Sequence, residues 1–147
     1  MNALVRATWL LLFAASVGCG EDKNKLSGSV AEVYPLGFDS VQVSIQGSFL
    51  VVEYAKGSGK VVKLSVSNEN LTVQPGQSID LTEAVTNGKR GTLQRIVETT
   101  IDLPMMTGTL TLESVPKTGA ELTGHFRALL SAPAGRTLNG DFSGTVR

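Results

Sequence analysis

The chain has 147 residues, of which 41% are hydrophobic and 18% are charged, and its 13 basic side chains balance 13 acidic ones. This length suits one domain, and the composition is that of a globular protein rather than a disordered one. The charge balance argues against a nucleic-acid-binding protein, which needs a basic excess to neutralise phosphates.

The first eighteen residues have the organisation of a secretory signal peptide. Residues 1–6 include the positively charged Arg6, residues 7–17 are mostly apolar, and small residues follow. A membrane-spanning helix needs about 20 apolar residues, and the polar stretch 20–25 ends this run too early. We therefore predict that residues 1–18 are a signal peptide that is removed, with an uncleaved anchor helix as the weaker alternative.

The only cysteine of the sequence, Cys19, stands where the apolar run ends. One cysteine cannot form an internal disulfide, so in an oxidising envelope it is modified, pairs with another molecule or stays reactive. The segment Ser16-Val17-Gly18-Cys19-Gly20 resembles the lipobox of bacterial lipoproteins. Ser16 departs from that pattern, in which leucine is usual, and Ser16 with Gly18 would also suit ordinary signal-peptidase cleavage.

The lipobox resemblance implies cleavage between Gly18 and Cys19 and a membrane anchor on Cys19. Two or three acyl chains, such as palmitate, would hold the protein stably on a bilayer. Residues 19–25 would then form the anchored cysteine and a short polar tether, which reaches about 20 Å when extended. In such lipoproteins an Asp after the cysteine often signals retention in the inner membrane. Gly20 stands there instead, which favours the outer membrane if the cell has two membranes.

Residues 26–147 are predicted to form a single all-β domain. Apolar and polar residues alternate in 40–46 and 62–67, which is the period of half-buried strands. Without a long helical period, short strands separated by Gly, Pro and Asn turns favour an antiparallel β-sandwich or a closed barrel of about eight or nine strands. Ten segments are candidates for these strands: residues 26–33, 40–46, 49–56, 62–67, 71–74, 79–82, 93–103, 109–115, 121–130 and 138–146.

A five-residue pattern with a central glycine recurs every sixteen residues near the C-terminus, at 106–110, 122–126 and 138–142. Similar segments occur at 26–30 and 45–49. In each, the glycine and two apolar residues fall on one face of a strand. Because glycine in a strand gives up packing, the repeat indicates bends or room for large residues on the neighbouring strand. We predict a C-terminal meander of three strands in which large and small residues interdigitate.

The registers of this meander are predicted from its turns. The turn after Leu130 is taken to centre on Ala134. The predicted pairs are Phe126 with Phe142, Gly124 with Gly144 and Arg127 with Asp141 in the last hairpin, and Leu112 with Gly124 and Leu110 with Phe126 in the hairpin before it.

Residue types that carry catalysis are sparse. His125 is the only histidine, and its strand phase points it outward between Thr111 and Ser143. The sequence lacks a nucleophile elbow, metal-ligand spacing and a phosphate loop. Its carboxylates are scattered, although a pair distant in sequence could still converge in the fold. We therefore predict no catalytic residues, no metal site and no cofactor.

Two short segments are candidates for contact with a partner or a membrane. Tyr34, Leu36 and Phe38 would form an apolar loop tip, or would plug the end of the domain, which is the favoured interpretation. Lys89 and Arg90 would lie on a turn and touch anionic headgroups, or would simply be solvated, as paired surface charges usually are.

The signal, the glycine-punctuated strands and the segments Phe38-Asp39 and Glu53-Tyr54 together resemble small lipoproteins common in myxobacteria and related bacteria. The resemblance implies location and architecture and brings no activity. Two functions remain open: a non-catalytic envelope module that binds a protein or cell-surface polymer, and a lipocalin-like carrier of a small apolar molecule. The carrier would need a closed barrel whose inward glycines leave a cavity. An enzyme is disfavoured.

Overall fold

The computed structural model describes residues 23–147. The predicted signal peptide, the cleavage site at Gly18 and the lipidation site at Cys19 lie outside these residues. The described chain folds into two five-stranded antiparallel sheets and a small two-stranded hairpin. This confirms the predicted all-β fold.

The strands divide between the sheets in an order that differs from their order along the chain. The first sheet has the order β1-β12-β11-β10-β5, and the second has the order β2-β3-β4-β8-β9. The first consists of β1 (Lys25–Ser27), β12 (Thr137–Thr145), β11 (Glu121–Leu130), β10 (Met105–Leu112) and β5 (Ser78–Asp80). The second consists of β2 (Ser40–Gln46), β3 (Phe49–Lys56), β4 (Gly59–Ser67), β8 (Gly91–Val97) and β9 (Thr99–Asp102). The hairpin pairs β6 (Ala84–Val85) with β7 (Gly88–Lys89).

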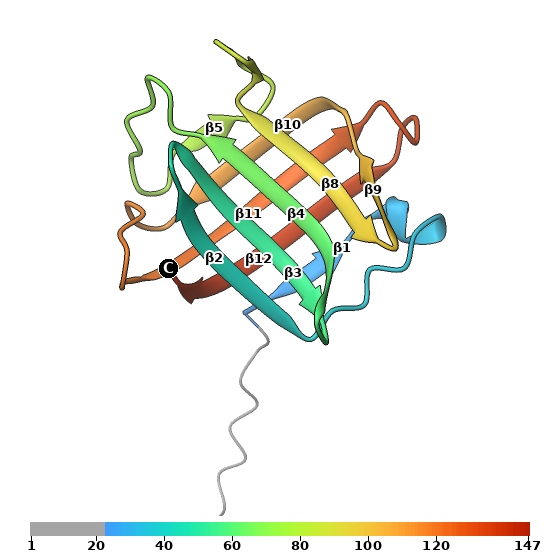
Figure 1. Ribbon diagram of the computed structural model, residues 1–147. Coiled ribbons are helices and arrows are strands. Elements are labelled where there is room, and N and C mark those ends of the chain that lie inside the picture. The colour runs from blue at the N-terminus through green and yellow to red at the C-terminus, as the bar shows by residue number, and fades with distance from the viewer. Residues whose placement is uncertain (1–22) are drawn as a thin grey trace, which may run out of the picture.

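The two sheets stack face to face as a sandwich. Figure 1 shows β10, β11 and β12 crossing the strands of the second sheet at a steep angle, as in orthogonal sheet packing. Alternate residues of both sheets point into one core, which explains the period-two pattern of the sequence. The largest fully buried side chains of this core include Tyr54, Phe126, Phe142, Leu64, Leu110 and Leu138.

Backbone hydrogen bonds join the two sheets at two corners. Val43 of β2 forms a parallel bridge with Val146, and Arg147 N donates to Val43 O at 3.0 Å. At the other corner, Leu81 N donates to Gly108 O and Leu81 O accepts from Gly91 N, both at 2.8 Å. The sheets nevertheless stay open and do not close into a single barrel, so the barrel alternative was wrong.

Three predicted strands differ from the observed elements. The predicted strand 26–33 ends at Ser27 because Gly28 turns with φ +128° directly against Thr137, and the 3-10 helix η1 (Ser29–Glu32) follows. Residues 71–74 alternate as predicted but pair with no strand. The predicted strand 93–103 divides into β8 and β9 at Glu98, whose φ is +60°.

The meander β10–β11–β12 is confirmed, with one of its two registers corrected. Leu112 faces Gly124 and Leu110 faces Phe126, as predicted. In the last hairpin the pairs are shifted by two residues, so that Phe126 faces Gly140 and Phe142 faces Gly124. A shift of two residues keeps every side chain on its predicted face.

Candidate functional site

An apolar pocket of about 510 Å³ lies at one end of the sandwich. Its buried floor comes from both sheets, through Leu50 and Val66 of the second sheet and Ile79, Leu110 and Leu112 of the first. The pocket therefore lies between the two sheets. We call this hollow the end pocket.

The rim of the end pocket is also apolar. Ile45, Phe49 and Val115 line it and are 38%, 42% and 57% exposed, respectively. Large apolar side chains this exposed are unusual in a small domain when they gather at one hollow. Ile45 and Phe49 flank the tight β2–β3 turn, and Val115 lies in the connection from β10 to β11. The rim thus extends the apolar floor to the surface.

One wall of the end pocket runs from Ser67, the last residue of β4, to Val73. Leu71 and Val73 are half-buried against the core, whereas Ser67, Asn68 and Thr72 contribute polar groups to the lining. Among the residues that the structure describes, none of those that line the pocket is charged. It is therefore suited to an uncharged apolar group, with hydroxyl and amide groups available at one side for hydrogen bonds.

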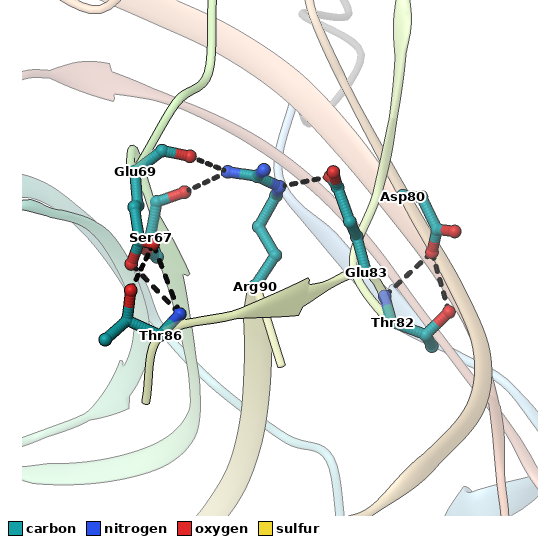
Figure 2. Close-up of polar contacts among 7 residues, drawn as sticks. All are labelled: Ser67, Glu69, Asp80, Thr82, Glu83, Thr86 and Arg90. Carbon is teal, nitrogen blue, oxygen red and sulfur yellow. Dashed lines mark hydrogen bonds and ion pairs between the residues drawn. The ribbon is translucent and has the colours of Figure 1, made fainter. Parts of the chain in front are cut away.

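A buried arginine holds this wall in place. Arg90 is 3% exposed, and its Nη1 donates to the carbonyl oxygens of Ser67 at 3.0 Å and Glu69 at 2.9 Å. Its Nε donates to the Glu83 carboxylate at 2.8 Å. Figure 2 shows the guanidinium between the two segments, joining Ser67 and Glu69 on one side to Glu83 on the other. Arg90, which does not line the pocket, thereby holds the backbone of Ser67 and Glu69 at the start of the pocket wall.

Side chains around Arg90 fix the same region by further hydrogen bonds. The Glu69 carboxylate accepts from the backbone N–H and the hydroxyl of Thr86 (Figure 2). Asp80 accepts from Thr82 N at 2.8 Å and from its hydroxyl at 2.7 Å. The hydrogen bonds from Thr82 lower the pKa of Asp80 below its ordinary value. These hydrogen bonds stabilise the fold, because they pair the polar groups with other groups of the protein.

The structure separates the two predicted contact segments. Tyr34, Leu36 and Phe38 are half-buried and pack against the core. The Phe38 ring meets the Tyr54 ring edge-on at 5.0 Å, which agrees with the favoured interpretation of a plug. These residues lie at the end of the sandwich away from the end pocket, beside the β3–β4 turn.

Lys89 and Arg90 do not act as a pair of surface charges. Lys89 is exposed, and its Nζ donates to Met105 O at 3.0 Å. The prediction that Arg90 contacts headgroups or is solvated was wrong, because its guanidinium is enclosed by Ser67, Glu69 and Glu83. Neither residue lines the end pocket.

The neighbours of His125 differ from the predicted ones. His125 lies opposite Thr111 and Asp141, rather than Ser143 as predicted, because of the shifted register. Within residues 23–147, no group of three or more His, Cys, Asp or Glu side chains is placed to hold a metal ion. The same residues include no helix that is both long and apolar enough to cross a membrane.

Comparison with protein-family models, with curated proteins and with solved structures finds no match to this chain.

Sequence reasoning missed the end pocket and the role of Arg90. The position of Phe49 could have indicated the pocket, because Phe49 is a large apolar residue beside a turn, where polar residues are usual.

Proposed function

We propose that this chain is a lipid-anchored, non-catalytic binding module of the bacterial cell envelope that takes an apolar ligand into the end pocket. The observation that carries the proposal is the continuous apolar surface from the buried floor to the exposed rim. Small-molecule sites are mostly apolar hollows of roughly 300–1,000 Å³ with a few polar groups. The end pocket has this size and this chemistry.

The lining favours an acyl chain over a compact polar ligand. Leu50, Leu110 and Leu112 offer no hydrogen-bond partner deep in the pocket, so a polar group there would lose its hydration without replacement. Ser67, Asn68 and Thr72 lie to one side, where they suit an ester or carboxyl group at the end of the chain. This is an end-pocket carrier rather than the lipocalin-like barrel, because the two sheets do not close into a barrel.

The proposed anchor on Cys19 would hold the described domain close to a membrane. Asn24 Oδ1 accepts from Ser143 N at 2.6 Å, and Lys23 Nζ lies 3.5 Å from the Glu121 carboxylate. Glu121 begins the strand that follows the Val115 connection. An acylated Cys19 would be only four residues from Lys23, which corresponds to roughly 13 Å of extended chain. The end pocket would then operate close to a bilayer, the outer membrane if the cell has two.

Mass spectrometry of the protein from its native membrane tests the anchor. The expected product begins at an acylated Cys19, and the Cys19→Ala variant should lack acyl chains and leave the membrane. An unacylated wild-type N-terminus that begins elsewhere would contradict the anchor. It would not bear on ligand binding by the end pocket, which is tested separately.

Binding of a fluorescent fatty acid to the full chain in detergent tests the pocket. Phe49→Ser and Val115→Ser remove rim side chains and should weaken binding by about tenfold, since each removes an apolar contact of about 1.5 kcal/mol. Met106→Ser is the matched control, because Met106 is 59% exposed but does not line the pocket. Equal binding by all three variants, or no binding by the wild type, would reject the pocket as the ligand site.

A further inference from the structure

A second hollow, of about 390 Å³, lies at the end of the sandwich opposite the end pocket. The β3–β4 turn, the segment 35–37 and the β8–β9 turn surround it, and Figure 1 shows these three connections gathered at the same end of the molecule. Three basic side chains line it: Lys56, Lys60 and Arg95. We call this hollow the basic pocket.

Arg95 occupies an unusual place for an arginine. It lies directly opposite the fully buried Val62, two residues after Leu93, and therefore on the core-facing side of β8. Its guanidinium carbon is 4.8 Å from the centre of the Tyr34 ring, a cation–π contact that restricts its orientation. The Nε atom of Arg95 is buried and has no hydrogen-bond partner within residues 23–147. A buried donor without a partner costs free energy and calls for an explanation.

The two lysines add positive charge to the same hollow. Lys56 is exposed, and its Nζ is 3.8 Å from the point where a Cβ on Gly37 would stand. In the part of the chain that the structure describes, Lys56 forms no ion pair. Lys60 donates to the nearly buried Glu53 carboxylate at 2.6 Å. Glu98 also lines the pocket. The lining thus holds three cationic side chains and one carboxylate, and of the three cations Lys60 is paired with Glu53.

We propose that the basic pocket binds a phosphate group. The planar guanidinium of Arg95 presents donors that match two phosphate oxygens, and Lys56 supplies a mobile point charge beside it. The Tyr34 ring holds the guanidinium before the anion arrives, which reduces the ordering that binding requires. Tyr34, which packs against the core, thus has a second role at the basic pocket. This site is independent of the end pocket and of the anchor.

Calorimetric titration of the full chain in detergent with inorganic phosphate, at low ionic strength, tests this site. Wild-type protein should bind phosphate, and Arg95→Gln should weaken binding by about tenfold or more, since a hydrogen bond to a charged group contributes about 1.5–3 kcal/mol. Lys56→Gln should also weaken it and, being an exposed position, leaves folding unchanged. Lys63→Gln is the matched control: it removes the same charge from β4 outside the basic pocket.

The outcomes separate the proposal from a general effect of charge. An equal loss in Lys63→Gln and Lys56→Gln, or no phosphate binding by the wild type, would overturn the site. Glycerol 3-phosphate, used as a second probe, distinguishes the source of the phosphate. Tighter binding of glycerol 3-phosphate than of inorganic phosphate, lost in Arg95→Gln, assigns a lipid headgroup. The reverse order, with the same loss, assigns free phosphate.

Discussion

Phe126 lies directly opposite Gly140 on the neighbouring strands β11 and β12, and its ring fills the space that a side chain at position 140 would need. A Cβ on Gly140 would stand 2.2 Å from the ring of Phe126 and 2.6 Å from the hydroxyl of Tyr54. Phe142 and Gly124 repeat the arrangement in the opposite direction, with 2.7 Å between ring and Cβ position. Gly124 and Gly140 therefore make room for the rings of Phe142 and Phe126.

Gly140→Ala should lower the free energy of unfolding by about 2 kcal/mol or more, because an added methyl group in a packed core forces rings and backbone apart. Gly144→Ala is the control on the same strand, since its Cβ would meet Val43 at an ordinary 3.4 Å. Urea denaturation of both variants measures the difference. Equal stabilities of the two variants would show that the Phe126 ring yields easily.

The sequence predicted that large and small residues alternate in this meander but assigned the wrong partners in its last hairpin. The period of two determines which face Phe126 and Phe142 occupy, and that prediction was correct. The partner depends on the centre of the turn. Because Phe126 pairs with Gly140, the turn centres on Pro133 and not on Ala134. Turn geometry is local, yet the choice between two neighbouring centres depends on the packing of these rings.

The site was harder to predict because its contacts join distant segments. Arg90 follows a predicted turn, where a solvated side chain is the ordinary expectation. Its acceptors Ser67 and Glu69 are 23 and 21 residues away, and their carbonyl oxygens belong to the backbone, which leaves no mark in the sequence. The end pocket is likewise lined by residues of both sheets, and no strand pattern reveals which strands of the two sheets come together there.

Arg90→Met should destabilise the domain by about 2 kcal/mol and weaken fatty-acid binding, because it removes the hydrogen bonds to Ser67 and Glu69 behind the pocket wall. Glu83→Gln keeps the arginine and changes only a partner that is 54% exposed, so its effect should be a few tenths of a kcal/mol. Chemical denaturation and probe binding measure the two effects. If Arg90→Met lost stability but bound the fatty acid normally, the wall would be held without the arginine.

Thr82→Val should raise the pKa of Asp80 toward its ordinary value. The Thr82 hydroxyl is the largest cause of the lowered pKa, and the backbone N–H of residue 82 also lowers it and remains in the variant. A lowered pKa in the folded state adds stability above the ordinary pKa, and this contribution is lost as pH falls through the folded value. NMR titration of the Asp80 carboxyl group in both proteins measures the shift. An unchanged pKa would show that the Thr82 hydroxyl is not the main cause of the lowered value.

Tyr54 should give the domain a stability that falls at high pH. Its side chain is fully buried, and its hydroxyl donates to Asp141 O at 2.8 Å. Burial, with the Asp141 carboxylate as a smaller cause, raises the pKa of Tyr54 far above its ordinary value of 10.0.

Between the ordinary and the folded pKa, the unfolded chain loses this proton while the folded chain retains it. The contribution is therefore complete below about pH 10 and decreases above it, with a slope approaching 1.4 kcal/mol per pH unit. Tyr54→Phe should lower the free energy of unfolding by about 1 kcal/mol at neutral pH, because the hydrogen bond is lost. Above pH 10 the variant should lack the decrease of about 1.4 kcal/mol per pH unit that Tyr54 causes. Denaturation of both proteins from pH 8 to pH 11 tests this. Parallel curves for the two proteins would show that the Tyr54 hydroxyl ionises without unfolding.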